Sequence, residues 1–291
     1  MWQGVRRVAT ATVAGWWRHE AMTLGAAIAY YGAFSLAPIL LLVISTAGLV
    51  FGEEAARGAV VRELSDLIGR REAQMLEAMV ASARNVGSGA VGTIVGIVLL
   101  LVLATGVLAQ IQNALHAIWE AQPPKSPFWA TLRSRLLSLA LIGSIGFLLL
   151  VSLVVDAGIA AAGTYAFRLF PGAELALIAA NFLLSLFFAS LLFGMVYWLL
   201  PEVRLPLRDL VPGAVLAGVL FTFGKSLIGL AAGRGEIASS FGAAASILTI
   251  LAWIYYASQI LLLGAAFAKA LRDRRVALGG TAPPPQPRSA T

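Results

Sequence analysis

Six long apolar segments, separated by shorter polar stretches, dominate the pattern of this chain. They cover residues 24–51, 91–118, 136–162, 175–200, 210–231 and 244–271. A transmembrane helix needs about 20 consecutive apolar residues, and each segment is long enough. Each is also bounded by charges, Pro or Gly. The pattern predicts an all-α membrane protein whose transmembrane domain, residues 24–271, is a bundle of about six helices.

The first residues of the chain carry a different pattern. Apolar side chains at Trp2, Val5, Ala9 and Val13 recur at helical spacing, with arginines on another side. Tryptophan and arginine together suit the headgroup layer of a membrane. Residues 1–23 are therefore predicted to form an interfacial amphipathic helix, with a poorly ordered tail as the alternative.

The long polar stretch at residues 53–89 also has helical periodicity. Val60, Leu64 and Leu67 share one helical face, and Met75 and Met79 share another further along. This spacing predicts one or two amphipathic helices on the periplasmic surface. Two roles are open for them, either capping a cavity or resting on the membrane.

The end of the chain has neither pattern. Residues 272–291 begin with charges and continue into a proline-rich stretch. Such a composition does not bury enough apolar surface to fold, so this segment is predicted to be a disordered cytoplasmic tail.

Composition supports the membrane interpretation. Hydrophobic residues make up 59% of the 291 residues and charged residues 12%, and the mean hydropathy is +0.86. Soluble domains carry roughly a quarter charged residues. The chain has no cysteine, which excludes a disulfide, a thiolate nucleophile and a cysteine metal site.

The chain has a net charge of +7, and its lysines and arginines are distributed unevenly between the two sides of the predicted membrane domain. With the N-terminus inside, the inner segments hold Arg6, Arg7, Arg18, Lys125, Arg133, Arg135, Arg204, Arg208, Lys269, Arg272, Arg274, Arg275 and Arg288. The short outer loops hold only Arg168 and Arg234, and the five arginines of residues 53–89 lie among acidic residues. Positive charge favours the cytoplasmic side. We expect a bacterial inner-membrane protein with both termini in the cytoplasm, membrane lipids as partners, and no nucleic acid.

Lys225 is the sharpest candidate for a functional site, because it lies within the fifth apolar segment. A charge at membrane depth costs at least ~2.5 kcal/mol on insertion scales, so it usually faces the bundle interior or a watery cavity. One interpretation is a contact to an anion or phosphate, or a charge relay; the other is snorkelling to the outer interface. Asp156 in the third segment either pairs with Lys225 or is exposed at the interface.

Polar side chains in other segments complete the candidate intramembrane site. Gln112 and His116 share one helical face by their spacing, and Asn181 and Gln259 are single amides in later segments. Such amides usually bond neighbouring helices, and together they are also suited to line a polar path. Pro38 predicts a kink in the first segment, which occurs both at transport sites and as a packing feature.

Enzyme templates fail on this sequence. The only two histidines, His19 and His116, do not form a metal-ligand pair, and no P-loop or G-x-S-x-G motif is present. Metal hydrolases need several nitrogen, sulfur or carboxylate ligands. We therefore predict no enzyme, no metal and no cofactor.

Several short motifs together resemble the YihY/virulence factor BrkB family of bacterial inner-membrane proteins. The resemblance covers about residues 17–271. The motifs are Ala29-Tyr30 with Ser35-Leu36-Ala37-Pro38, Ala114-Leu115-His116-Ala117-Ile118-Trp119, Val196-Tyr197-Trp198-Leu199-Leu200-Pro201, Pro212-Gly213-Ala214, Leu220-Phe221-Thr222-Phe223-Gly224-Lys225, Trp253-Ile254-Tyr255-Tyr256 and Leu263-Gly264-Ala265. The resemblance implies a six-helix membrane protein of poorly defined activity.

This chain departs from the family pattern at two positions. Ala266 stands where the family usually has an acidic residue, and Ala231 where it usually has tyrosine. Some members have carried a ribonuclease BN label, but the scarcity of metal ligands argues against that activity here.

The sequence thus favours a membrane bundle that handles or transports a lipid-like or anionic amphiphile. That hypothesis predicts an internal cavity reached by Lys225. The alternative, a structural or scaffolding membrane protein without substrate, predicts a dry, fully packed bundle with Lys225 at the headgroups. The sequence indicates no oligomeric state.

Overall fold

All regular structure in the described part of this protein is helical. The computed structural model describes residues 2–84, 89–121, 140–144, 146–148, 151, 155, 173–201, 205–232 and 243–279. The helices within them are α1 (Trp2–Arg18), α2 (Ala21–Phe51), α3 (Glu53–Ile68), α4 (Arg70–Arg84), α5 (Gly89–Trp119), α7 (Ala173–Leu199), α8 (Leu207–Ala232) and α10 (Ala243–Ala277). No strand occurs among these residues, and the predicted fold class is confirmed.

Five of the described helices are long and apolar enough to cross a membrane. The candidate spans are Ala21–Leu49, Leu101–Trp119, Ala179–Leu199, Leu207–Lys225 and Ser246–Ala277. They coincide with five of the six predicted segments. The predicted segment at 136–162 lies largely outside the described residues, of which 140–144 and 146–148 are helical.

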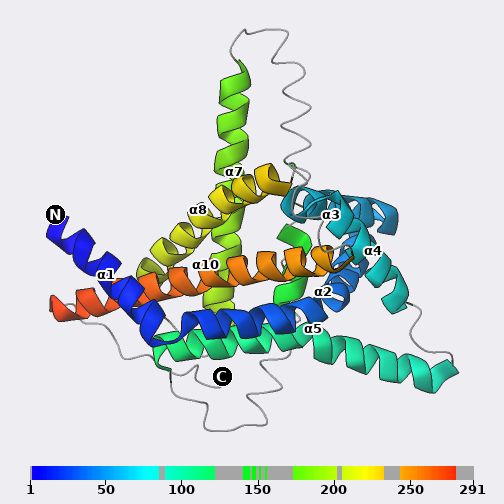
Figure 1. Ribbon diagram of the computed structural model, residues 1–291, viewed down its shortest axis with the longest axis horizontal. Helices are drawn as coiled ribbons and strands as arrows, with labels where there is room; N and C mark the ends of the chain where they lie inside the picture. The colour runs from blue at the N-terminus through cyan, green and yellow to red at the C-terminus, as the bar shows by residue number, and fades with distance from the viewer. Residues whose placement is uncertain are drawn as a thin grey trace.

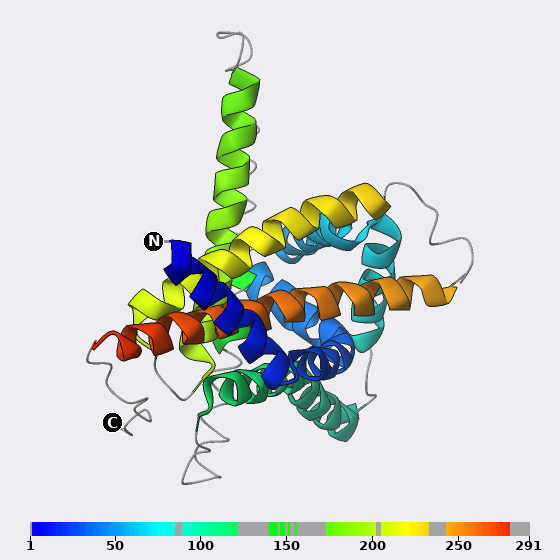
Figure 2. The same cartoon turned by 60° about the vertical axis from the view of Figure 1, so that its left-hand side comes forward.

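The N-terminal helix α1 does not stand apart from the bundle. It packs against the C-terminal part of α10, as two views of the chain show (Figures 1 and 2). Val8 and Thr12 are buried on its inner side, whereas Val13 and Trp17 remain exposed on its outer side. The chain then turns at Glu20, whose φ of 50° is left-handed, and continues directly into α2.

The stretch after α2 forms the two helices α3 and α4, which we call the hairpin. Gly52 separates α2 from α3 with a φ of 85°, and Gly69 separates α3 from α4 with a φ of 101°. These positive angles favour glycine, which has no Cβ to clash. Glu53 and Glu54 occupy the first turn of α3, where the helix dipole stabilises negative charge. The structure therefore gives two helices where the sequence predicted one or two.

Close helix contacts hold the bundle together through small residues. A Cβ on Gly213 of α8 would lie 2.5 Å from the carbonyl oxygen of Gly264 of α10, so only glycine permits this crossing. Gly25 of α2 is packed in the same way against α10, where Ser258 Oγ donates to the Gly25 carbonyl at 3.1 Å. In the low-dielectric environment of a membrane, such contacts replace the hydrophobic drive between helices.

Aromatic side chains fill the space between α5, α7, α8 and α10. Trp119, Phe193 and Phe221 each pack within 6.5 Å, centroid to centroid, of another ring in this cluster. The polar atoms of this cluster form hydrogen bonds with backbone carbonyls. Trp119 Nε1 donates to the Ala265 carbonyl at 3.1 Å, and Tyr197 Oη donates to the Leu261 carbonyl at 2.6 Å. The cluster packs the ends of α5 and α7 against the middle parts of α8 and α10.

Pro38 lies buried inside α2, which continues as one helix on both sides of it. One turn earlier, Ser35 Oγ donates to the Leu103 carbonyl of α5 at 2.5 Å. The hydroxyl thus joins α2 to α5 beside the proline. The predicted kink at Pro38 stays a prediction.

Two ends of the molecule carry most of the charged contacts described below. We call the termini end the one that holds α1, Glu120, the start of α8 and the last turns of α10; the hairpin end holds α3, α4 and Lys225 (Figure 1). Helix α7 packs on α8 and projects away from the other helices in both views (Figures 1 and 2).

Candidate functional site

Lys225, the sharpest sequence candidate, is held in an ion pair at the hairpin end. Its Nζ lies 3.0 Å from Oε1 of Glu63 on α3, and both side chains are about one third exposed, at 31% and 34%. The pair therefore joins α8 to the hairpin. Asp156, the partner suggested by the sequence, lies outside the described residues.

The remaining candidates are distributed over several helices. Asn181 lies on the exposed side of α7, and Gln112 is buried in α5 with His116 half-buried one turn later. Gln259 Nε2 donates to the Ala21 carbonyl at 3.2 Å, while its Oε1 is buried without a hydrogen-bond partner among the described residues. Lys225 and Gln259 therefore bond to groups outside the candidate set.

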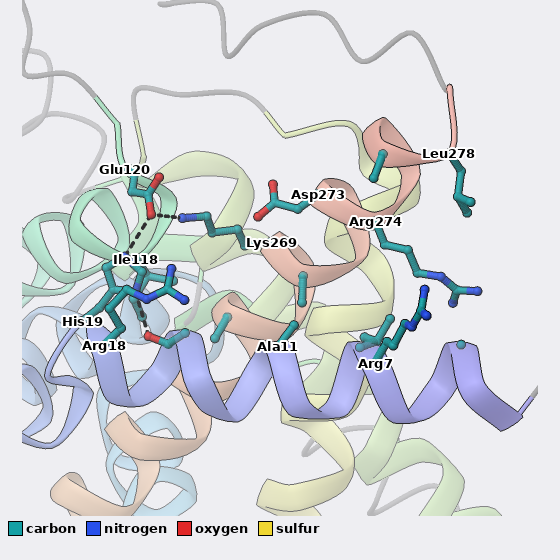
Figure 3. Close-up of a pocket in the computed structure, with 16 residues that line it drawn as sticks. Arg7, Ala11, Arg18, His19, Ile118, Glu120, Lys269, Asp273, Arg274 and Leu278 are labelled. Carbon is teal, nitrogen blue, oxygen red and sulfur yellow. Dashed lines mark hydrogen bonds and ion pairs between the residues drawn. The ribbon is translucent and has the colours of Figure 1, made fainter.

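A cavity of about 870 Å³ lies instead at the termini end (Figure 3). Helix α1 forms one wall, the last turns of α10 form the other, and the end of α5 closes one side. Its charged lining consists of Arg7, Arg18, Lys269 and Arg274 with the carboxylates Glu120 and Asp273; its apolar lining includes Val8, Ala11, Ile118, Ala266 and Ala270. We call it the α1–α10 cavity.

Helical spacing explains how these side chains come to face one another. On α1 the lining residues recur at intervals of three or four, from Gly4 through Arg7, Ala11 and Gly15 to Arg18. On α10 the same rule brings Lys269 and Asp273 onto one face. Because α1 packs on the C-terminal part of α10, these two helical faces meet across the cavity.

One end of the α1–α10 cavity is closed by a charge network around Glu120. The carboxylate of Glu120 lies 2.5 Å from Lys269 Nζ and 3.2 Å from His19 Nε2. The hydrogen bond from Lys269 and its positive charge hold the pKa of Glu120 below its usual range, and His19 acts in the same direction. The network thus joins α1, α5 and α10 at one point.

His19 completes this network with both ring nitrogens. Nδ1 lies 2.7 Å from the Gly15 carbonyl oxygen, and Nε2 faces the Glu120 carboxylate. His19 thereby links the end of α1 to the Glu120 carboxylate.

The other cations of the cavity are not neutralised in this way. Arg7, Arg18 and Arg274 are exposed, and no carboxylate among the described residues lies in an ion pair with them. Four permanent cations therefore face two carboxylates, which leaves a surplus of two positive charges. A low-dielectric wall on one side strengthens the field of such a surplus.

A second ion pair at the termini end lies outside the cavity. Oδ1 of Asp209, in the first turn of α8, lies 2.5 Å from Nη1 of Arg275 on α10. The Asp209 side chain is almost fully buried, at 2% exposed, and that of Arg275 is 35% exposed. This pair ties α8 to α10 and is a structural contact.

Sequence reasoning missed the cavity because its charges had another explanation. The sequence accounts for Arg7, Arg18, Lys269 and Arg274 by topology and by contact with lipid headgroups, and it does not single out Glu120. The available signal was the repeat of polar residues on one face of α1 and of α10. Among the described residues, no three His, Asp or Glu side chains gather as a metal site would require.

Comparison with known proteins identifies the relatives of this chain. The sequence profile of the family described as Virulence factor BrkB matches residues 12–289. The chain belongs to the BrkB family. No solved structure matches it.

Curated members of this kind are named only as membrane proteins. A UPF0761 membrane protein of Glaesserella parasuis is 28% identical over 212 residues, covering 71% of this chain and 69% of the relative. One from Pseudomonas aeruginosa is 28% identical over 276 residues, with 88% and 61% covered, and one from Azotobacter vinelandii is 28% identical over 249 residues, with 82% and 57% covered. The chain thus spans about 60% of the length of the last two. Their names give no enzymatic activity, and they support a multi-pass membrane protein.

The residues that carry the BrkB resemblance meet in the structure as a packing cluster. Trp119 donates to Ala265, and a Cβ on Gly264 would lie 2.5 Å from Tyr197 Oη and 2.7 Å from the Gly213 carbonyl oxygen. Motifs far apart in the BrkB sequence thus meet at one crossing of α5, α7, α8 and α10. Ala266, where the resemblance leads us to expect an acid, lies next to this crossing on the wall of the α1–α10 cavity.

Proposed function

We propose that this BrkB-family protein binds and handles an anionic amphiphile, whose headgroup occupies the α1–α10 cavity. The observation that carries this proposal is the surplus of positive charge lining a cavity of about 870 Å³ between two helices of a membrane protein. An anion that enters it meets several cations and displaces no existing ion pair of Arg7, Arg18 or Arg274.

The walls of the cavity favour an amphiphile over a small soluble anion. Val8, Ala11 and Ala270 lie beside the charged groups, so one ligand would contact both kinds of surface. The outer side of α1 presents Val13 and Trp17, which are 58% and 68% exposed. An exposed tryptophan beside basic residues is typical of a helix in the headgroup layer.

The charge distribution supports a cytoplasmic position for the cavity. Arg6, Arg7 and Arg18 of α1 lie at the same end as Arg272, Arg274 and Arg275 of α10. Lysine and arginine favour the cytoplasmic side of a bacterial inner membrane, whose leaflet is also anionic. We infer that both α1 and the end of α10 face the cytoplasm, so the ligand enters from the inner leaflet.

A second candidate function is that of a structural membrane protein without a ligand. The observation that favours it is the pairing of Lys225 with Glu63, because an intramembrane lysine that fixes a helical hairpin has a packing role. In this alternative, the cations of α1 and α10 would contact bulk lipid headgroups without selectivity.

The test is native mass spectrometry of the gently extracted protein with two matched variants. Ala11→Glu adds a carboxylate to the cavity at an exposed position, and Ala9→Glu adds the same charge to the outer side of the same helix. We expect a retained anionic lipid on the wild type and on Ala9→Glu, and about tenfold weaker retention on Ala11→Glu, because a like charge near the headgroup costs on the order of 1 kcal/mol or more.

Two results would contradict the proposal. The first is the absence of any retained anionic lipid on the wild type. The second is the same set of lipids, at the same intensity, on all three proteins. Either result would favour the structural role, since a nonselective surface does not distinguish the two sides of α1.

A further inference from the structure

We propose that the α1–α10 cavity is selective for a phosphate monoester, clamped as a dianion between Arg7 of α1 and Arg274 of α10. This inference rests on the proposed function and names the chemical class of the headgroup. The shared chemistry is a terminal phosphate group, whether it belongs to a lipid of the phosphatidate kind or to a soluble phosphate ester.

The geometry of the two arginines carries the inference. Figure 3 shows the side chains of Arg7 and Arg274 extending toward one another from the two walls of the cavity. Neither guanidinium forms an ion pair with a described carboxylate. Two guanidinium groups held close together repel each other. An anion bound between them is attracted to both, and these attractions outweigh the repulsion.

The backbone of α1 makes room for this arrangement at Gly4. A Cβ at this position would collide with the guanidinium of Arg274, so any larger residue would displace that side chain. Gly4 therefore lets the side chain of Arg274 lie directly against α1, the helix that carries Arg7. The placement of a glycine at this point is what brings the two guanidinium groups within reach of one ligand.

The acidic residues of the cavity do not occupy the place between these arginines. Asp273 is directed toward the Lys269 side of the cavity and away from the two guanidinium groups (Figure 3). Glu120 is already engaged by Lys269 and His19 at the other end. The surplus positive charge is therefore concentrated at the end where Arg7 and Arg274 meet.

The size of the surplus distinguishes a monoester from a diester. The cavity has an excess of two positive charges, counted without His19. A phosphate monoester carries about −1.5 to −2 charges at pH 7 and has three terminal oxygens, whereas a diester carries one charge and two such oxygens. Two arginine forks, each able to bind two oxygens, match the monoester better in both charge and hydrogen bonds.

The experiment measures lipid binding by the full-length protein in nanodiscs of phosphatidylcholine. One preparation contains phosphatidate, a monoester, and the other an equal mole fraction of phosphatidylglycerol, a diester. The variants are Arg7→Gln and Arg274→Gln, with the matched controls Arg6→Gln and Arg272→Gln, which remove neighbouring charges outside the cavity lining. Arg274→Lys keeps the charge and removes the fork.

We expect phosphatidate to bind about tenfold more tightly than phosphatidylglycerol, which corresponds to about 1.4 kcal/mol. Arg7→Gln and Arg274→Gln should abolish this preference, Arg274→Lys should reduce it, and both controls should retain it. Inorganic phosphate and glycerol 3-phosphate serve as competitors. If a soluble competitor binds as tightly as phosphatidate does, the ligand is a soluble phosphate ester. If the competitors bind much more weakly than phosphatidate, the ligand is the lipid.

The outcomes separate this inference from the proposed function. Equal binding of both lipids, reduced by Ala11→Glu but unaffected by the arginine variants, would overturn the monoester clamp and leave the proposed function standing. Binding of neither lipid above phosphatidylcholine would overturn both. A loss in the controls equal to that in Arg7→Gln and Arg274→Gln would also overturn the clamp, because the effect would then follow net charge.

Discussion

The two ends of this molecule contain the same kinds of charged residues and use them differently. At the hairpin end, two cations pair with acids, Lys225 with Glu63 at 3.0 Å and Arg57 with Glu77 at 2.8 Å, and Arg62 and Arg70 are exposed on the outside of the hairpin. At the termini end, Arg7, Arg18 and Arg274 have no such partner among the described residues. At both ends the paired cations connect helices, whereas the unpaired cations Arg7, Arg18 and Arg274 of the termini end line a cavity.

The matched pairs at the hairpin end connect helices. Glu63 joins α3 to α8, Arg57 and Glu77 join α3 to α4, and Glu72 accepts a hydrogen bond from Ser246 of α10 at 3.2 Å. The contacts of Glu63 and Glu72 hold the hairpin on the bundle, and the Arg57–Glu77 pair holds its two helices together. At the termini end, the unmatched cations line a cavity between α1 and α10, and they remain available to an anion.

The largest expected effect is at the Asp209–Arg275 ion pair, which lies at the termini end but outside the cavity. Arg275→Gln would leave the buried Asp209 carboxylate without its partner and lower the free energy of unfolding by about 2–3 kcal/mol, discounted for the partial exposure of Arg275. Arg272→Gln, on the same helix, should change it by less than about 0.5 kcal/mol. Denaturant titration in detergent measures both.

The same pair also tests whether structural and binding charges are separable. Arg275 does not line the cavity, so Arg275→Gln should retain anionic lipids at temperatures where it is folded. Adding Asp209→Asn should restore part of the lost stability, because the buried charge is then removed. Equal stability of Arg275→Gln and Arg272→Gln would show that Asp209 needs no partner.

At the hairpin end, the expected effect is smaller. Lys225 and Glu63 are each about one third exposed, and pairs of this exposure are worth up to ~1 kcal/mol. A double-mutant cycle with Lys225→Gln and Glu63→Gln should give a coupling energy of about 0.5–1 kcal/mol. Lipid retention should stay at the wild-type level in all three variants. A selective loss of lipid in Lys225→Gln would move the binding site to this end.

The Glu120 network gives the termini end a pH dependence. The pKa of Glu120 is lowered in the folded protein, first by the hydrogen bond from Lys269. Its contribution to docking of α1 is therefore present above the usual carboxyl range and lost as pH falls through the lowered value. Hydrogen exchange of α1 amides should rise about two- to fivefold in Glu120→Gln at neutral pH, the size expected for an exposed pair.

The Glu120→Gln variant, measured at two pH values, is the control for this prediction. Glu120→Gln should have the same α1 exchange at neutral and at acidic pH once intrinsic rates are corrected, whereas the wild type should approach the variant only in acid. Retention of the wild-type pH dependence in Glu120→Gln would assign it to other carboxylates, of which Asp273 lies in the same cavity.

An effect of similar size is expected at the contact between α4 and α10. Ser246→Ala removes the hydroxyl that donates to Glu72 and should cost about 0.5–1 kcal/mol, the usual net value of one hydrogen bond. Thermal unfolding in detergent measures it, with Ser82→Ala on the exposed side of α4 as the control. Equal melting temperatures of the two variants would mean that this contact does not hold the hairpin.

The helices were predictable from sequence because insertion into lipid depends on apolar content and length. The predicted starts at residues 24 and 210 differ by three residues from the observed starts at Ala21 and Leu207. The largest difference is at the end of α10, predicted at residue 271 and observed at Ala277. Charged residues end the lipid-facing part of a helix without ending its backbone hydrogen bonds, so the helix continues through Arg272 and Arg275.

The site was less predictable because partners in it are distant in sequence. Nothing near Lys225 indicates Glu63, and nothing near Glu120 indicates Lys269 or His19. A cation at a helix end has the same sequence signature whether it contacts lipid, an acid or a ligand. The BrkB motifs, too, identified residues that pack at one helix crossing, around Trp119 and Tyr197, and of the residues that line the cavity they contain Ile118 but none of the charged ones.

The length of α10 determines how a lipid would reach the α1–α10 cavity. Its 35 residues extend for about 52 Å at ~1.5 Å per residue, whereas the hydrocarbon layer is only ~30 Å thick. No charge occurs in α10 before Lys269, so part of the excess length is its charged C-terminal end, a composition that suits the headgroup layer. A lipid would therefore enter sideways, by lateral diffusion, and bind with its acyl chains still in the bilayer. The energetic cost of extracting those chains from the membrane would not arise.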